Sequence, residues 1–146
     1  MKKVCLFLVF VLLLGCFAGC HPAPVESTER SIENEDGTLS DWMKEEIEAA
    51  YKNLGFQYSW TEDSPKTLRY YGTDNGYVIF YQRLSLTSVG EIVIADKTFI
   101  SNNRFLLLAY KDGELLQLKD VFEQGLISTE AITNTWNKHQ EYEENS

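Results

Sequence analysis

Residues 104–110, RFLLLAY, decide the fold, because Phe105 to Ala109 are all apolar and leave a strand no polar face. A strand that is apolar on both faces is typical of the interior of a sheet that is covered on both sides. Asp112-Gly113 then turns the chain into a second leucine-rich stretch, residues 115–118. We therefore expect a central strand at residues 104–110.

The preceding segments alternate in the way that strands do. In residues 77–83 one face carries Tyr77, Ile79, Tyr81 and Arg83, and the other carries Val78, Phe80 and Gln82. Residues 68–71 should pair with this strand across a turn at residues 72–76, where two glycines tolerate positive φ. Two short strands are expected at residues 91–95 and 98–100, around Asp96-Lys97.

Apolar residues recur at three- and four-residue steps over residues 39–54, which predicts an amphipathic helix. Thr38 and Asp41 have capping-box spacing, and Ser40 is a second candidate cap. Residues 118–124 predict a short helix before Gly125. Ser128 should cap the last helix, with Ile127 and Ile132 as a hydrophobic staple across the cap. Ile132, Thr135, Trp136 and His139 should share one side of that helix, and Glu141, Glu143 and Glu144 are expected in a solvated tail.

This order of elements predicts the α+β class. We expect an antiparallel sheet of five or six strands, preceded by the amphipathic helix and followed by two helices. The domain should span residues 38–146 as a single unit, without disulfides, because Cys5, Cys16 and Cys20 all lie near the start of the chain.

The first residues have the features of a signal peptide: Met1-Lys2-Lys3, then an apolar stretch over residues 4–14, then small residues. Phe17-Ala18-Gly19-Cys20 resembles the lipobox of bacterial lipoproteins, and Leu13-Leu14-Gly15-Cys16 is a rival site whose Leu14 is bulky. The resemblance implies removal of residues 1–19, acylation of Cys20 and a lipid-anchored place on the extracytoplasmic face of the cell membrane. A retained signal anchor and plain secretion are the alternatives.

Residues 20–37 are acidic and poor in aliphatic side chains, so we expect a flexible stalk. Loss of Lys2 and Lys3 with the leader would take Lys plus Arg from 13 to 11, and 11 minus 22 acidic residues gives a net charge of −11. Nucleic acid and anionic lipid head groups are therefore unfavourable partners for the exported domain.

Three segments, residues 70–78, 109–114 and 118–130, are similar to segments of a group of small uncharacterised proteins of Gram-positive gut-type bacteria. The resemblance covers roughly the second half of the chain and rests on turns and helix caps. It implies one compact domain and supplies no catalytic residue, because the group has no assigned activity.

The sequence gives no motif for catalysis, cofactor binding or metal binding. Beyond the leader there are only His21 and His139, and no cysteine at zinc-ligand spacing. Six residues after Gly76 and Gly113 stand Gln82 and Lys119, where a calcium loop needs an acid. His139, alone on the last helix near Trp136, is expected to be a packed or rim residue and not a catalytic one.

The strongest functional signal is aromatic. Tyr70, Tyr71, Tyr77 and Tyr81 are a candidate ligand-binding face, since rings with polar rims contact sugars and peptides. The alternative is that these rings pack under the helices. We expect a membrane-tethered binding or interaction module for cell-wall glycan, peptide or another surface protein. An envelope hydrolase using paired carboxylates, and a structural or regulatory lipoprotein without a small ligand, are the alternatives.

Overall fold

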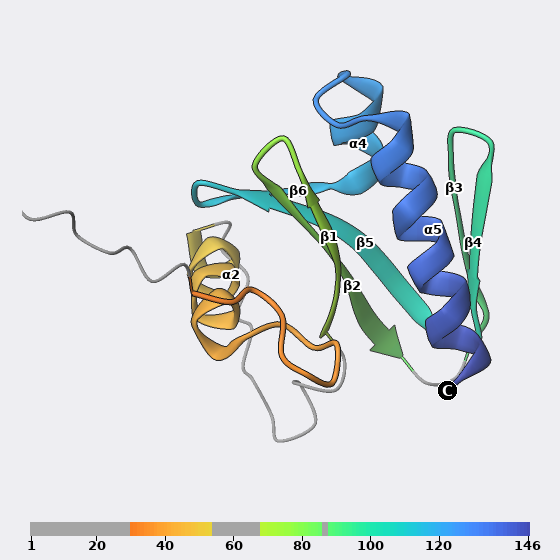
Figure 1. Cartoon of the computed structure of the whole chain (residues 1–146), viewed down its shortest axis with the longest axis horizontal. Coiled ribbons are helices and arrows are strands. Elements are labelled where there is room, and N and C mark those ends of the chain that lie inside the picture. The colour runs from red at the N-terminus through yellow and green to blue at the C-terminus, as the bar shows by residue number, and fades with distance from the viewer. Residues whose placement is uncertain (1–29, 54–67, 86–87) are drawn as a thin grey trace, which may run out of the picture. The chain divides into compact units, whose positions relative to one another are not determined.

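The computed structural model describes residues 30–53, 68–85 and 88–146, and the compact unit formed by these ranges begins at Ser31 (Figure 1). The predicted leader, Cys16, Cys20 and the first part of the predicted stalk lie outside the described residues.

No helix in the described ranges is both long enough and apolar enough to cross a bilayer.

In the described ranges six strands form two antiparallel sheets, and together with the helices they confirm the predicted α+β class. The larger sheet has the order β1-β2-β5-β6, formed by Leu68–Asp74, Tyr77–Ser85, Arg104–Lys111 and Glu114–Gln117. Strands β3 (Gly90–Ile94) and β4 (Lys97–Ser101) pair only with each other, as a separate two-stranded ribbon. The single sheet of five or six strands that the sequence predicts is therefore divided into a sheet of four strands and a ribbon of two.

The helices in the described part of the chain are α2 (Asp41–Asn53), α4 (Leu118–Glu123) and α5 (Thr129–Glu144), and they flank these strands (Figure 1). Helix α2 covers most of the predicted range 39–54. Helix α5 begins at the predicted cap, where Ser128 Oγ accepts a hydrogen bond from the Ala131 amide at 3.1 Å. The helix continues through Glu144, so Glu141, Glu143 and Glu144 are helical and do not form the predicted tail, although Glu141 and Glu144 are exposed as expected.

Tight turns close two of the hairpins. Asn75 and Gly76 join β1 to β2 with φ angles of 49° and 81°, and Asp112 and Gly113 join β5 to β6 with 50° and 84°. Two consecutive residues at positive φ match the right-handed twist of the flanking strands. Because the turn takes only Asn75 and Gly76, strand β1 extends to Asp74, further than the predicted end at residue 71. Its pairing with β2 has a register irregularity between Tyr70 and Gly72.

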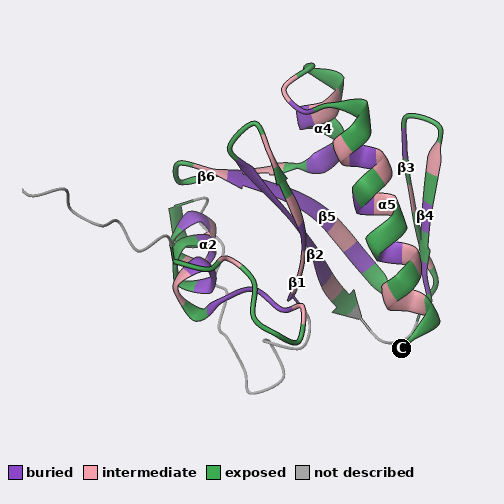
Figure 2. Cartoon of the chain, viewed as in Figure 1, coloured by how far each residue is buried: buried purple, intermediate pink, exposed green. Residues whose placement is uncertain are grey.

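The four-stranded sheet has a hydrophobic core on each face (Figure 2). The core under α5, here called the α5-side core, contains Tyr77, Ile79 and Tyr81 of β2 and also receives Ile94 and Phe99 of the ribbon. The core under α2, here called the α2-side core, contains Val78 and Phe80 of β2 with Leu39, Met43 and Ile47. Strand β5 contributes Leu107 and Ala109 to the first core and Leu108 and Tyr110 to the second, which confirms that it is covered on both sides.

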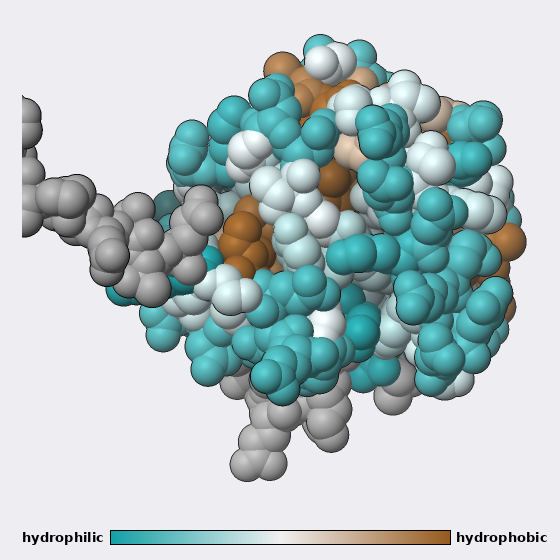
Figure 3. Space-filling model, viewed as in Figure 1, coloured by the Kyte–Doolittle hydropathy of each residue, from teal (hydrophilic) through white to brown (hydrophobic). Residues whose placement is uncertain are grey.

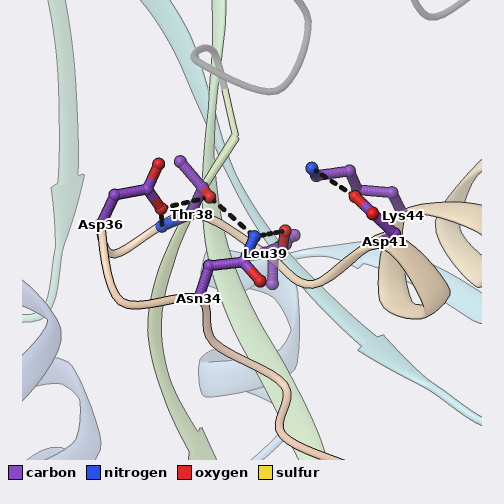
Figure 4. Close-up of polar contacts among 6 residues, drawn as sticks. All are labelled: Asn34, Asp36, Thr38, Leu39, Asp41 and Lys44. Carbon is purple, nitrogen blue, oxygen red and sulfur yellow. Dashed lines mark hydrogen bonds and ion pairs between the residues drawn. The ribbon is translucent and has the colours of Figure 1, made fainter.

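Residues 31–37 belong to the compact unit, which starts earlier than the predicted boundary at residue 38. Isolated β-bridges join Glu33 to Leu39 and Thr38 to Arg69. The Asn34 side chain donates to the Leu39 carbonyl at 2.9 Å (Figure 4). An acidic segment with few aliphatic residues is thus fixed through its backbone and its short polar side chains.

The predicted capping box at Thr38 and Asp41 does not form. The Thr38 hydroxyl donates to Asp36 Oδ1 at 2.5 Å, so it is turned away from the helix (Figure 4). The Ser40 carbonyl instead accepts hydrogen bonds from the amides of Met43 and Lys44, at 3.1 and 3.0 Å. The start of α2 is therefore set by the backbone of Ser40.

Candidate functional site

A hollow of about 420 Å³ lies at the edge strand β1, between residues 33–37 and the C-terminal part of α5. Its volume falls within the range of about 300–1,000 Å³ that small-ligand sites occupy. We call it the charged pocket; its lining comprises Glu33, Glu35, Asp36, Gly37, Arg69, Tyr70, Tyr71, Lys138, Glu141, Tyr142, Asn145 and Ser146. The molecular face in Figure 3 is predominantly hydrophilic, with apolar surface confined to small areas.

Arg69 is held in a defined position in the charged pocket. Its guanidinium carbon lies 4.3 Å from the centroid of the Tyr142 ring, and Nη2 donates to the Asp36 carbonyl at 3.1 Å. Gly37 makes this position available: its φ is +79°, and a Cβ on it would lie 2.5 Å from Arg69 Nη2. The glycine therefore lets the guanidinium lie directly over the backbone.

Lys138 supplies the second cation from α5. Its Nζ lies 5.0 Å from the centroid of the Tyr70 ring, within the range of cation–π attraction. The Tyr70 hydroxyl is 2.9 Å from Thr73 Oγ1, so the ring is tethered along the edge of the sheet. Helix and edge strand thus bring a cation and a tyrosine together across 68 residues of sequence.

Four exposed acidic residues line the same pocket: Glu33, Glu35, Asp36 and Glu141. Within the described ranges, neither Arg69 nor Lys138 has a carboxylate oxygen within 4.0 Å. The pKa of Asp36 is lowered, first by the hydrogen bond from the Thr38 hydroxyl, then by the Thr38 amide, with a smaller contribution from the Arg69 charge. The pocket therefore holds opposite charges without pairing its two cations.

The four tyrosines predicted as a ligand-binding face do not form one exposed surface. Tyr77 and Tyr81 are only 8% and 0% exposed and pack in the α5-side core. Tyr71 is 3% exposed, and Tyr70 packs against the opposite, α2-side core. Tyr70 and Tyr71 nevertheless line the charged pocket, because they lie on the edge strand.

Sequence reasoning did not select Arg69, Lys138 or Tyr142. A weak signal was present, since Lys138 and Tyr142 are four residues apart and share one face of a helix. From the sequence we make no prediction for this helix face and expect a solvated tail at Glu141, Glu143 and Glu144. Only the folded arrangement brings this helix face next to Arg69.

Of the two expected positions for His139, packed or rim, the structure shows the packed one, with 0% exposure. Its Nε2 lies 2.8 Å from the Ile100 carbonyl, which can only accept, so Nε2 carries the proton. Nδ1 is then the acceptor for the Tyr71 hydroxyl at 2.9 Å. Burial lowers the pKa of His139 and raises that of Tyr71, so both groups are held neutral.

Within the described residues there is no group of three or more His, Cys, Asp or Glu side chains that could hold a metal ion. Comparison with protein-family models, with curated proteins and with solved structures finds no match to this chain. The charged pocket and the sequence of residues 1–20 are therefore the features that bear on function.

Proposed function

We propose that this chain is a lipid-anchored envelope protein whose exported domain binds a ligand in the charged pocket. The lipobox-like residues 17–20 support an anchor on Cys20 and a place on the extracytoplasmic side of the cell membrane. Ligands available there are cell-wall glycan, peptide and other surface proteins. The acidic balance of 22 Asp and Glu against 13 Lys and Arg argues against nucleic acid.

The observation that carries this proposal is the pair of cations on tyrosine rings, Arg69 on Tyr142 and Lys138 on Tyr70, neither with a carboxylate partner among the described residues. An exposed ion pair contributes only about 0–1 kcal/mol to folding, so leaving the cations unpaired costs the fold little. A bound anionic group could accept charge-assisted hydrogen bonds from both, at about 1.5–3 kcal/mol each where water is displaced. The arrangement favours ligand binding over a purely structural role.

Hydrolysis by paired carboxylates is less well supported. A general acid that works near neutral pH needs a raised pKa. The pKa of Asp36 is lowered by hydrogen bonds to its carboxylate, and all four acidic residues of the pocket are exposed. We therefore favour binding without chemistry.

The binding role is tested with the acylated full chain in detergent micelles and purified cell-wall glycan and peptide fragments. Replacing Lys138 by Gln should weaken binding about fivefold or more, because one of the two cations is lost. Lys119→Gln is the matched control, since Lys119 is also exposed on a helix but does not line the pocket. If the Lys138→Gln variant and the chain without this substitution bind every fragment with equal affinity, the proposed site is refuted.

The anchor is tested separately by metabolic labelling with a fatty-acid probe. Cys20→Ala should abolish labelling, whereas Cys16→Ala should leave it intact. Labelling that survives Cys20→Ala and disappears in Cys16→Ala would move the anchor to Cys16. An unlabelled and unprocessed chain in the cytosol would refute the envelope location.

A further inference from the structure

Building on the proposed binding role, we infer that the charged pocket takes a zwitterionic ligand, a short peptide with a free amino end and a free carboxyl end. The inference concerns the ligand class of that same pocket. It rests on the two cations, which have no carboxylate partner in the described part of the chain, on the four carboxylates, and on the tyrosine rings that the cations contact.

The carboxylate of such a ligand fits the two cations. Arg69 is fixed by the Tyr142 ring and by the Asp36 carbonyl, and a guanidinium has five N–H donors, of which this hydrogen bond uses one. The planar guanidinium can donate two parallel hydrogen bonds to one carboxylate. Lys138 is on a flexible stem and can approach the same group from α5.

A ligand with negative charge alone does not fit the whole pocket. Two cations against four carboxylates leave a local balance of −2 if all six groups are ionised. Like charges about 4 Å apart in water-like surroundings repel by about 1 kcal/mol per pair, and more as water is excluded. Phosphate or sulfate would be repelled by the four carboxylates of the pocket. An ammonium group on the ligand would instead be attracted to these carboxylates.

The part of the ligand between its two charged ends would contact the tyrosines. Tyr70 and Tyr142 are partly exposed, and both rings already carry a cation on one face. Aromatic rings of this kind provide apolar contact area next to polar edges, which suits a peptide backbone with small side chains. A ligand with only a positive charge would leave both pocket cations unsatisfied and would be repelled by them.

The test measures dissociation constants of the full chain in micelles for tri-alanine, its C-terminal amide and its N-acetyl form. We expect free tri-alanine to bind about five- to tenfold more tightly than either blocked form. In Lys138→Gln, blocking the carboxyl end should have a smaller effect than in the unsubstituted chain, because only Arg69 remains to bind the carboxylate, while acetylation should still weaken binding. Lys119→Gln should reproduce the pattern of the unmodified chain.

Equal binding of the three tripeptides, or no binding of free tri-alanine at about 10 mM, would overturn the zwitterion inference. The binding role would survive that result if wall fragments still bound and still depended on Lys138. Loss of both the tripeptide pattern and the Lys138 dependence would refute the pocket itself. Inorganic phosphate serves as the purely anionic probe, and tighter binding of phosphate than of tri-alanine would also refute the zwitterion.

Discussion

The two faces of the four-stranded sheet are covered by hydrophobic cores of different composition. The α2-side core is largely aliphatic, although the buried Gln82 side chain accepts a hydrogen bond from the Tyr51 hydroxyl on this face and Tyr110 Oη donates to Glu46 at 2.8 Å. The α5-side core has aromatic rings stacked around a buried imidazole, with His139 5.3 Å from Phe105 between ring centroids. Apolar contacts tolerate small shifts, whereas hydrogen bonds of defined length and direction do not. The geometry of the α5-side core is therefore more tightly constrained than that of the α2-side core.

The hydrogen bonds of His139 in the α5-side core also affect the geometry of the charged pocket. His139 joins three elements, because it lies on α5, accepts from Tyr71 of β1 and donates to Ile100 of β4. Lys138 and Tyr70 are the immediate sequence neighbours of His139 and Tyr71. The buried bond between His139 and Tyr71 thus fixes the spacing between the pocket's helix wall and its strand wall.

The largest expected effect is that of His139→Ala. The variant loses a fully buried ring and leaves the Tyr71 hydroxyl and the Ile100 carbonyl without partners. We expect unfolding free energy measured in urea to fall by about 4 kcal/mol, against about 3 kcal/mol for Ile47→Ala in the α2-side core. A smaller loss for His139→Ala than for Ile47→Ala would contradict the contrast between the faces.

A double-mutant cycle serves as its control. Tyr71→Phe removes the hydroxyl and should cost less in the His139→Ala background than in the unmodified chain, by about 1 kcal/mol, because the hydroxyl has already lost its partner. Strictly additive losses would show that the bond does not contribute to the stability of the α5-side core.

The second prediction is a dependence of stability on pH. Burial lowers the folded-state pKa of His139, while the bond to the Ile100 carbonyl and the charge of Glu143 oppose this more weakly. The unfolded chain therefore takes up a proton at higher pH than the folded chain. The contribution of neutral His139 is complete above about pH 6.5, the unfolded value, and is lost as the pH falls from there toward the lowered folded pKa.

Urea unfolding at a series of pH values checks this, with His139→Ala as the comparison. The loss below about pH 6.5 should be present in the unmodified chain and reduced in the variant. Asp36 also has a lowered pKa, but its contribution to stability is lost only as the pH falls below the ordinary carboxyl value of 3.8. The pH ranges in which Asp36 and His139 lose their contributions are therefore separate. An equal slope in both proteins between pH 6.5 and 4.5 would contradict a neutral buried imidazole.

Local patterns predicted the elements of this fold but not how the ribbon is placed. The apolar run of β5 and the alternation of β2 are properties of neighbouring residues, so they could be read from the sequence. Whether β3 and β4 extend the main sheet or form their own ribbon depends on α5, which contacts β4. Residues 31–37 have the composition of a linker, and their order comes from backbone bridges that composition does not reveal.

The candidate site was harder to predict, for a related reason. Alternating tyrosines look the same whether a helix covers them or water does, so Tyr77 and Tyr81 gave no sign that α5 lies over them. The charged pocket is assembled from three separate stretches, residues 33–37, the edge of β1 and the end of α5. Of the four predicted tyrosines, Tyr70 and Tyr71 line the charged pocket, and neither of its two cations was predicted.

The smallest expected effect tests whether Gly37 sets the position of the Arg69 guanidinium in the charged pocket. Gly37→Ala and Gly113→Ala place a Cβ on residues with φ of +79° and +84°, so backbone strain should lower stability by about 1 kcal/mol in both. At Gly113 the new Cβ meets nothing within 4 Å, whereas at Gly37 it meets Arg69 Nη2 at 2.5 Å. Only Gly37→Ala should therefore displace the guanidinium, shift the ring resonances of Tyr142 and weaken tri-alanine binding. If the two variants bind tri-alanine equally, the position of Arg69 over Gly37 is a consequence of packing and does not define the pocket.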